Sequence, residues 1–283
     1  MLRYYKLGLH IHTDRSDGKR SPEQVIDLYK ENGYDAIAMT DHWKCSENGW
    51  AGDMLLLAGA EYNNKGSNSI DGIFHILGFG MEYDPGLERD TDPQSAIDAI
   101  RKAGGMAVLA HPAWSMNTLE QAKGLTGLEA SEIYNAVSES HQSIRAYSTH
   151  FLECCANAGI YYRVLATDDA HYYEGDDACM GWVMAKMESL SRENVLKALR
   201  DGDFYATQGP ELYVRREGNE VIVACSPCSY IAVMTNMVWR TGRVVRGQGL
   251  TSHSYTLKED EAWFRVEVQD ENGKYAWSNI FEV

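Results

Sequence analysis

Histidines and carboxylates recur along the first two thirds of this 283-residue chain at spacings that suit a metal centre. The residues concerned are His10, His12, Asp17, His42, Glu61, His75, His111, Asp169 and His171. Imidazole nitrogens and carboxylate oxygens, without thiolates, are ligands that zinc, manganese and iron accept. His10 and His12 stand two residues apart, a spacing that points both rings to one face of a strand. Asp169 and His171 repeat that spacing.

Nearly all of these residues fall at or just past the end of a predicted strand. His10 and His12 end the first strand, and His42 and His111 follow two later ones. The carboxyl ends of parallel strands meet at one rim, where barrels and open α/β sheets carry their active sites. So many acids and imidazoles in one cavity would be costly without bound cations. We therefore expect the nine side chains to meet around metal ions.

Each of these residues has a simpler explanation when it is taken singly. A lone histidine such as His75 is more often a packed residue than a ligand, and one H-x-H spacing is moderately common by chance. Their conjunction, in order and at successive predicted strand ends, favours a metal centre.

Asp41 and Asp168 adjoin expected ligands and are candidates for orienting imidazoles. The remaining histidines, His141, His150 and His253, lie away from the strand ends and are expected to be structural.

Strands alternate with helices up to about residue 203, which predicts an α/β fold with a parallel sheet, open or closed into a barrel. The predicted strands are Tyr4–Ile11, Asp35–Thr40, Met54–Glu61, Ile73–Gly80, Met106–Ala110, Gly127–Ile133 and Tyr162–Ala166. The predicted helices are Pro22–Asn32, Asp92–Ala103, Leu119–Lys123, Ser138–Ala158 and Arg192–Arg200. Ser21 can cap the first helix, with Pro22 in its first turn and Gln24 three residues after the cap.

The pattern changes from about Phe204, where short apolar runs are separated by turns and no helical period is evident. The predicted strands there are Leu212–Arg215, Val221–Ala224, Ile231–Thr235, Ser254–Leu257 and Phe264–Val268. This pattern is typical of a small all-β domain such as a sandwich. We therefore expect a metal-binding domain at residues 1–203 and a β-rich domain at residues 204–283.

The formal net charge of −15 narrows the classes of partner. An acidic surface repels phosphate backbones and anionic lipids, so neither a nucleic-acid polymer nor a membrane is expected as a partner. A small phosphorylated substrate is compatible, because bound cations reverse the field locally. No run reaches the roughly 20 apolar residues of a membrane span, and no signal peptide is visible, so a cytoplasmic location is expected. The oligomeric state is left open.

Six cysteines are spread over the chain, and we expect them to be reduced thiols. Cys225 and Cys228 form one C-x-x-C pair. No second pair and no histidine cluster follow it, so it is a weak signal of a metal or redox site.

The order of the histidine and carboxylate motifs resembles that of the PHP (polymerase and histidinol phosphatase) family. The segments that carry the resemblance are His10-Ile11-His12-Thr13 with Ser16-Asp17-Gly18, Thr40-Asp41-His42, Gly59-Ala60-Glu61, His75-Ile76-Leu77-Gly78, His111-Pro112 and Asp169-Ala170-His171. The resemblance covers roughly residues 1–205. The segment that begins at Gly202 resembles the C-terminal module of a subset of PHP-like metallohydrolases.

The resemblance implies a distorted (β/α)7 barrel with a small C-terminal all-β, sandwich-like domain, and two to three divalent ions of zinc, manganese or iron. One metal would be held by His10, His12, Glu61 and Asp169, a second by Glu61, His75 and His111, and a third by Asp17, His42 and His171. Many family members have a histidine where Asp17 stands, which leaves a ligand in place but puts the identity and affinity of the third metal in doubt.

The expected activity is that of a phosphoesterase, which releases phosphate from a small phosphorylated metabolite or nucleotide. The expected nucleophile is a hydroxide that bridges the metals, so no side-chain nucleophile is required. In agreement, the sequence has no G-x-S-x-G elbow and no G-x-x-x-x-G-K-[ST] loop. Arg15 and Lys44 are candidates to contact phosphate oxygens, and Trp114 is a candidate to stack on a ring.

Two other interpretations remain open at this point. The same metals could polarise the carbonyl of an amide, a carbamate or a carboxylic ester, and the C-terminal module slightly raises this option. Alternatively, the first domain could be a non-enzymatic scaffold with the C-terminal region as its binding surface. The presence of every expected ligand position argues against the scaffold.

Overall fold

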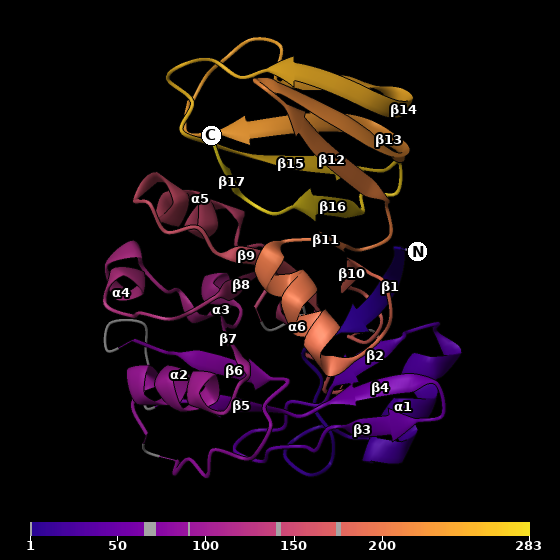
Figure 1. Ribbon diagram of the computed structural model, residues 1–283, viewed down its shortest axis with the longest axis vertical. Helices are drawn as coiled ribbons and strands as arrows, with labels where there is room; N and C mark the ends of the chain where they lie inside the picture. The colour runs from indigo at the N-terminus through magenta and orange to yellow at the C-terminus, as the bar shows by residue number, and fades with distance from the viewer. Residues whose placement is uncertain (1, 65–71, 90, 140–142, 174–176) are drawn as a thin grey trace.

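The computed structural model describes residues 2–64, 72–89, 91–139, 143–173 and 177–283. Its strands form two sheets (Figure 1). The smaller sheet contains, in spatial order, β5 (Gly59–Asn63), β6 (His75–Phe79), β7 (Met106–Leu109), β8 (Ala130–Asn135) and β9 (Arg163–Thr167). The N-terminal part of the larger sheet contains β10 (Trp182–Met187), β1 (Arg3–Gly8), β2 (Ala36–Ala38), β4 (Met54–Leu57) and β3 (Gly49–Ala51).

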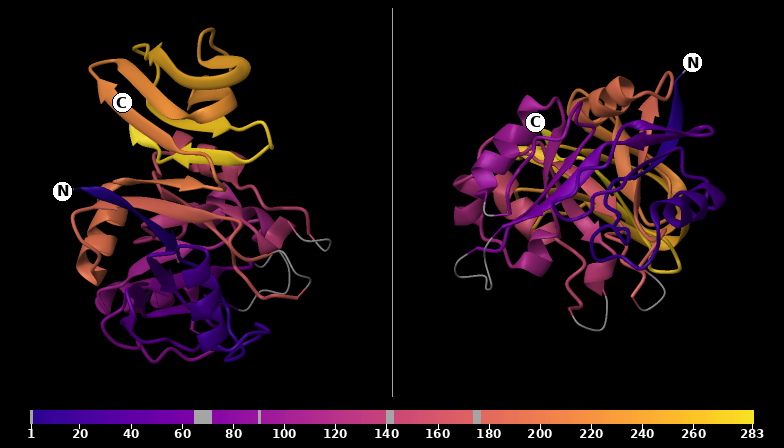
Figure 2. Two further views of the ribbon diagram at one scale, coloured as in Figure 1. Left: turned by 90° about the vertical axis from the view of Figure 1, so that its right-hand side faces the viewer. Right: turned by 90° about the horizontal axis from the view of Figure 1, so that it is seen from below.

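The remainder of the larger sheet is built from the C-terminal strands. They are β11 (Phe204–Thr207), β12 (Leu212–Glu217), β13 (Glu220–Thr235), β14 (Val244–Thr256), β15 (Trp263–Gln269), β16 (Tyr275–Ser278) and β17 (Phe281–Glu282). β11 pairs with β10 on one side and with β16 on the other, so hydrogen bonding runs across the expected boundary at residue 203. The predicted β-rich C-terminal region is present, and Figure 2 shows it at one end of the molecule. Its separation into a domain of its own stays a prediction.

The helices agree with the predicted periodicity with two exceptions, of which the first is the short helix Pro112–Ser115, absent from the prediction. They are α1 (Pro22–Glu31), α2 (Pro93–Lys102), α3 (Pro112–Ser115), α4 (Leu119–Lys123), α5 (Thr149–Asn157) and α6 (Arg192–Asp201). α1 begins with the expected capping box: the Ser21 side chain accepts from the backbone of Gln24, whose side chain accepts from the backbone N–H of Ser21.

The helix predicted at Ser138–Ala158 is too long. α5 covers only its C-terminal half, a short 3-10 helix (Val137–Glu139) precedes it, and residues 140–142, with His141, lie outside the described residues. Tyr147 instead forms a β-bridge with Tyr134, and the backbone N–H of Ser148 donates to the carbonyl of Ile133. These tertiary hydrogen bonds use backbone groups that a helix would need.

The expected all-parallel sheet is a mixed one. β1, β2 and β4 are parallel to one another, as are β7, β8 and β9, whereas β6 is antiparallel to both β5 and β7. The predicted strand Met54–Glu61 is split, because β4 pairs in the larger sheet and β5 in the smaller one. The fold is thus mixed α/β with large sheets and few helices, and closure into a (β/α)7 barrel stays a prediction.

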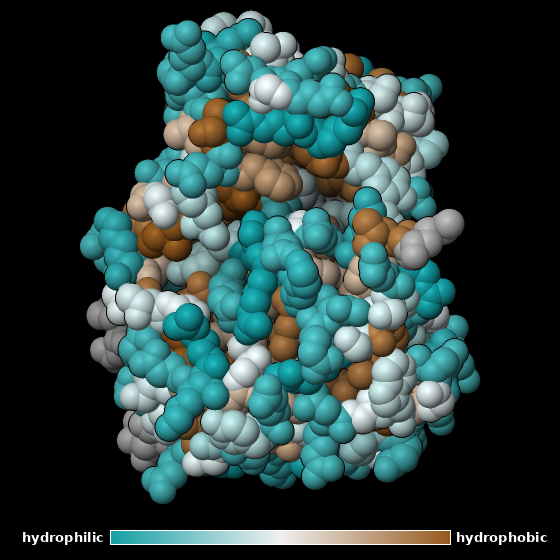
Figure 3. All heavy atoms as spheres, in the orientation of Figure 1, coloured by the Kyte–Doolittle hydropathy of each residue, from teal (hydrophilic) through white to brown (hydrophobic). Residues whose placement is uncertain are grey.

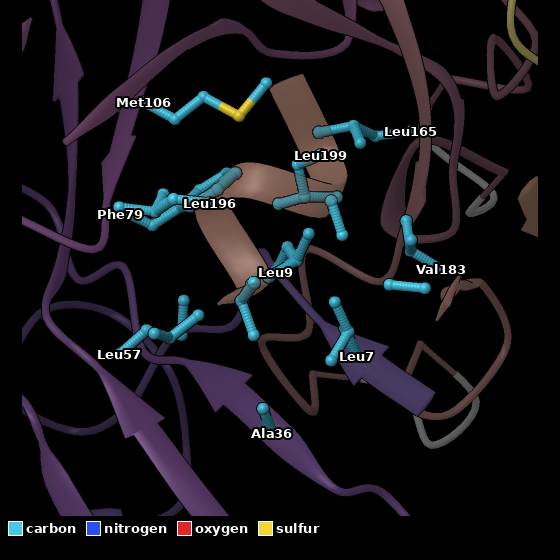
Figure 4. Packing of buried hydrophobic residues seen from close by; sticks show 14 of the residues in the cluster. Leu7, Leu9, Ala36, Leu57, Phe79, Met106, Leu165, Val183, Leu196 and Leu199 are labelled. Atoms are coloured by element: carbon cyan, nitrogen blue, oxygen red, sulfur yellow. The ribbon is translucent and has the colours of Figure 1, made fainter. Parts of the chain in front are cut away.

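Apolar side chains from both sheets and from α6 fill the space between them. Figure 4 shows Leu7, Leu57 and Phe79 facing Leu196 and Leu199 of α6, and each of these side chains is buried. Removing an apolar side chain from such a core typically costs about 2–5 kcal/mol. This core fixes the strands whose ends carry the candidate ligands.

The surface seen in Figure 3 is mostly hydrophilic, with hydrophobic residues gathered where the C-terminal strands meet the rest of the molecule. Within the described part of the chain, none of the helices combines the length and the apolar composition that crossing a membrane requires.

Candidate metal centre

Backbone hydrogen bonds bring two chain segments together. Beyond β1 the chain continues extended, and Ile11 forms a parallel bridge with Ala170. The backbone N–H of His12 donates to the carbonyl of Ala170 at 3.0 Å, and that of Asp169 donates to the carbonyl of His10 at 2.9 Å. The two pairs predicted from their spacing, His10 with His12 and Asp169 with His171, therefore come from adjacent segments.

Glu61 and His75 join this edge in a different way. His42 forms a parallel bridge with Glu61, which places the end of β5 beside the segment after β2. His75 is the first residue of β6 rather than its last. Because β6 is antiparallel to β5, with Asn63 opposite His75, the first residue of β6 lies at the same edge as the last residues of β5.

The first candidate site contains His10, His12, Glu61 and Asp169, all buried, with one potential ligand atom each within 4.8 Å of the others. Nε2 of His10 lies 3.1 Å from Oδ1 of Asp169, and Nε2 of His12 lies at the same distance from that oxygen. Oε2 of Glu61 is 3.2 Å from Nε2 of His12.

The second candidate site shares Glu61 and adds His75 and His111. Oε1 of Glu61 lies 2.8 Å from Nδ1 of His75 and 3.3 Å from Nε2 of His111. The two oxygens of one carboxylate therefore face different groups of imidazoles, the geometry of a bridging ligand.

The third candidate site contains Asp17, His42 and His171, as expected, and also His12. Oδ2 of Asp17 lies 3.4 Å from Nε2 of His171 and 3.7 Å from Nε2 of His42. The Asp17 side chain is 43% exposed, so this site opens to solvent, unlike the first. Gly18 allows the approach, since a Cβ there would lie 2.9 Å from the backbone of His12.

The donor set fits metal cations, because it is unsatisfied by protein groups alone. Nε2 of His10 and Nε2 of His12 face each other at 3.2 Å, and Oδ1 of Asp169 is buried without a hydrogen-bond partner. Both imidazoles approach that oxygen closely, but neither is oriented to donate to it. Buried polar atoms are rarely left unpaired, and a cation at the point where these lone pairs converge would satisfy all three.

The charges of the site also suit bound cations. Burial raises the pKa of Glu61 and of Asp169, but the surrounding imidazoles outweigh it and hold both values well below the usual range. Burial lowers the pKa of His12, yet the nearby carboxylates of Asp169 and Glu61 raise it to about 9. The pKa of His42 is lowered, because its burial outweighs the opposing effect of Glu61 and Asp17. The carboxylates are thus anionic at neutral pH, as metal ligands must be.

Glu132 is a functional residue that the sequence reasoning missed. Its buried carboxylate accepts from Nδ1 of His10 at 2.8 Å, which leaves Nε2 free to face the first site. It also accepts from the Thr167 hydroxyl, the backbone N–H of His111 and the Asn135 amide, each at 2.8 Å. Metal-binding histidines commonly donate their second ring N–H to such a carboxylate. A glutamate inside a predicted strand, Gly127–Ile133, was the available signal.

The orienting role expected of Asp41 and Asp168 is wrong, because neither contacts an imidazole among its hydrogen bonds. Asp41 holds the loop after His12 by accepting from Thr13 and from the Ser16 hydroxyl. Asp168 accepts from the Tyr29 hydroxyl and from the backbone N–H groups of Cys179, Met180 and Gly181. Both carboxylates fix loops that flank the site.

Two candidate ligands have a backbone conformation that L-residues rarely adopt. The φ angles of His111 and Asp169 are 27° and 53°. Such conformations cost about 1–3 kcal/mol each and concentrate at functional sites. The surrounding packing therefore holds these two side chains in place at a cost in stability.

Of the three residues expected to contact substrate, Trp114 contacts two candidate ligands. Trp114, on α3, is 37% exposed, and its ring centre lies 4.9 Å from that of His111 and 5.5 Å from that of His75. Lys44 and Arg15 are exposed, and the Lys44 ammonium donates to the Arg15 carbonyl. Tyr173, which the sequence did not single out, stacks on His171 with ring centres 5.1 Å apart.

A similar solved structure supports the fold. A two-domain protein from Bacteroides vulgatus, described as containing a predicted PHP-like metal-dependent phosphoesterase, is similar at a TM-score of 0.56 and 14% identity, over 100% of this chain and 95% of that one. A putative metal-dependent phosphoesterase from Bifidobacterium adolescentis has a TM-score of 0.42 at 16% identity, covering 58% of this chain and 87% of the other.

A lesion-specific endonuclease from Pyrococcus furiosus reaches a TM-score of 0.49 at 13% identity, over 71% of this chain and 56% of that one. No curated protein matches the sequence. The family model described as PHP domain matches residues 8–229, which include all nine candidate ligands and extend into β13. The chain therefore belongs to the PHP domain family and is a hydrolase.

Proposed function

We propose that this protein is a metal-dependent phosphoesterase that acts on a small phosphorylated metabolite or nucleotide. The observation that carries the proposal is the sharing of Glu61 between two groups of ligands and of His12 between two. Shared ligands imply closely spaced cations, and a cluster of cations suits a phosphate ester, whose charge is spread over several oxygens.

Two or three divalent ions of zinc, manganese or iron are proposed. The first would be held by His10, His12, Glu61 and Asp169, the second by Glu61, His75 and His111, and the third by Asp17, His42 and His171, with His12 beside it. Bound ions of this kind lower the pKa of water toward neutrality and neutralise phosphate charge.

Neighbouring side chains hold the imidazole rings of the candidate ligands in place. Glu132 fixes the ring of His10, and the Ser115 hydroxyl lies 3.1 Å from Nδ1 of His111. The Ser16 hydroxyl beside His12 donates to Asp41 and is thereby engaged. We therefore propose water as the nucleophile, with no side chain attacking the substrate.

The substrate would enter from the exposed side, where Asp17 reaches solvent. Arg15 and Lys44 are positioned near that side and would contact further anionic oxygens, while Trp114 offers an exposed ring beside the second site. The net charge of −15 disfavours a nucleic-acid polymer as the substrate.

We also propose that the two sheets enclose the centre as a distorted (β/α)7 barrel and that residues 204–283 form a separate domain.

The test is metal analysis followed by an activity screen. Protein loaded separately with manganese, zinc and iron is assayed on nitrophenyl phosphate, nucleoside monophosphates, an aryl carbamate and an aryl ester. We expect at least two ions per chain and turnover confined to the phosphate esters. Turnover of the carbamate or ester alone would replace the proposal with carbonyl hydrolysis, and fewer than one ion with no turnover would favour a scaffold.

Arg15→Gln and Lys44→Gln then test the substrate side. Loss of either cation is expected to raise KM for a nucleoside monophosphate several-fold while metal content stays constant. Asp14→Asn, an exposed change in the same loop, serves as the control. An unchanged KM in both cation variants would remove these two residues from the substrate site.

A further inference from the structure

Two cysteines in the C-terminal strands lie close together without belonging to the metal centre. They end the segment Cys225-Ser226-Pro227-Cys228 within β13, and their sulfur atoms are 3.6 Å apart as free thiols. Cys228 is buried and Cys225 is half-buried. None of the potential metal-binding groups found among the described residues includes them.

Regular strand geometry would keep these two side chains apart. Residues three apart in a strand point to opposite faces, with Cα atoms about 10 Å from each other. Here β13 is bulged: between the pairs Ala224–Ser252 and Cys228–Leu250 it holds two more residues than β14. Pro227 lies inside this bulge, where its missing N–H breaks no ladder hydrogen bond. The bulge is what brings Cys225 to Cys228.

Both thiols also face one backbone acceptor. The carbonyl of Leu250 lies 3.2 Å from Sγ of Cys228 and 3.7 Å from Sγ of Cys225. Fixed positions on one side of a bulged strand leave only a small movement between contact and a covalent bond, since sulfur atoms in a disulfide are about 2 Å apart.

We propose that Cys225 and Cys228 are a redox-active dithiol that closes to a disulfide with a low-molecular-weight disulfide as the oxidant. The Cys225 thiolate attacks the oxidant and releases one thiol, forming a mixed disulfide. The Cys228 thiolate then attacks Sγ of Cys225 and releases the second thiol. Two electrons and the two protons of the cysteines thus pass to the oxidant, which leaves as two thiols.

The same environment makes this exchange slow. Burial and the neighbouring Cys228 raise the pKa of Cys225 to about 12, and burial raises the pKa of Cys228. Because only the thiolate reacts, exchange near neutral pH proceeds through a small reactive fraction. We therefore expect a disulfide that forms over a long incubation and persists until a strong dithiol reductant is added.

Cys154 and Cys155 provide an internal control in the same molecule. They are consecutive residues of α5, so their side chains diverge by about 100° around the helix axis. Cys155 is buried and Cys154 is partly exposed. Under the same oxidant these two thiols should not form a disulfide with each other.

Native, folded protein is incubated with glutathione disulfide, its free thiols are blocked with an alkylating reagent, and it is digested with trypsin. Cleavage after Arg216 and Arg240 gives a peptide of residues 217–240 that contains both Cys225 and Cys228 and no other cysteine. We expect this peptide to carry no alkyl group and to be two hydrogens lighter than the unmodified dithiol peptide, and to carry two alkyl groups after prior reduction with dithiothreitol. The peptide of residues 146–163, with Cys154 and Cys155, should lack an internal disulfide.

The proposal is overturned if residues 217–240 stay fully alkylated after prolonged oxidation, or if a mixed disulfide on Cys225 accumulates without closing. Cys225→Ser should abolish the mass loss in this peptide, whereas Cys154→Ser should leave it unchanged. Cys225 is the half-buried member of the pair, so its serine variant tests the site with the smaller risk to folding.

Discussion

Two buried clusters of charge in this molecule are built on opposite principles. Between α5 and β15, the buried Arg265 guanidinium donates to Glu153 at 2.5 and 3.1 Å and to Glu267 at 3.0 Å. Glu267 accepts further hydrogen bonds from the Trp277 indole and the Tyr230 hydroxyl. Every charged group there has a partner within the protein, as buried charges require.

The candidate metal centre, in contrast, leaves its charges incompletely matched. Oδ2 of Asp169 accepts from the Asn135 amide, but its Oδ1 is buried without a hydrogen-bond donor. Glu61 lies among imidazoles, and Nε2 of His10 lies 3.2 Å from Nε2 of His12. The difference separates buried charges that stabilise the fold from those that bind a ligand. A satisfied cluster stabilises the fold, whereas an unsatisfied one is complementary to a cation that the protein does not itself supply.

The largest expected effect comes from Asp169→Ala. Removal of this carboxylate should lower kcat by about 10³-fold or more, because loss of metal-centred charge stabilisation is worth several kcal/mol. The metal-free variant should remain folded, because Asp169 does not belong to the apolar core that fixes the strands. Activity and thermal unfolding are measured side by side, with Asp98→Ala on α2 as the control. Near-normal turnover would show that Asp169 is not a ligand.

Arg265→Met should give the converse result. It leaves the Glu153 and Glu267 carboxylates without their cation, and we expect a loss of about 3 kcal/mol in the free energy of unfolding. Metal content and kcat should be unchanged below the unfolding transition. Chemical denaturation with metal analysis checks both expectations, and Arg215→Met, an exposed change on β12, is the matched control. A loss of metal with no loss of stability would remove the contrast between the two clusters.

Glu132→Gln should weaken metal binding through a residue that is not itself a candidate ligand. The amide keeps the shape of the side chain but loses the charge that orients His10, and metal affinity should fall about 10- to 100-fold. Chelator competition measures the affinity, and Glu129→Gln, whose carboxylate pairs with Arg200 instead, is the control. Equal affinities in the two variants would mean that Glu132 has only a structural role.

The smallest expected effect is that of Asp17→Asn, because this ligand is the most exposed one. We expect the variant to lose one equivalent of metal at limiting metal concentration and to lose activity by about 10-fold, a cost of about 1.4 kcal/mol. Metal titration followed by elemental analysis gives the stoichiometry. If all equivalents were retained with unchanged affinity, the third site would not depend on Asp17.

The sequence alone identified the nine candidate ligands, because most of them are histidines or carboxylates at or just past a predicted strand end. All five predicted helices have counterparts, one of them shorter than predicted, since apolar periodicity and caps such as Ser21 are local properties. The strand pattern also revealed the β-rich C-terminal region, although Val221–Ala224 and Ile231–Thr235 proved to be parts of the single strand β13.

Tertiary structure alone decided how those residues meet. β6 is antiparallel to its neighbours, so its first residue, His75, lies at the edge that carries the ligands. This direction depends on pairing with distant strands and leaves no local signal in the sequence. The same is true of Glu132, whose role exists only because β8 lies between β7 and β9 with its carboxylate directed at His10. Residue types and local periodicity are written in the chain, whereas register, strand direction and shared ligands arise only when separate segments compete for the same hydrogen bonds.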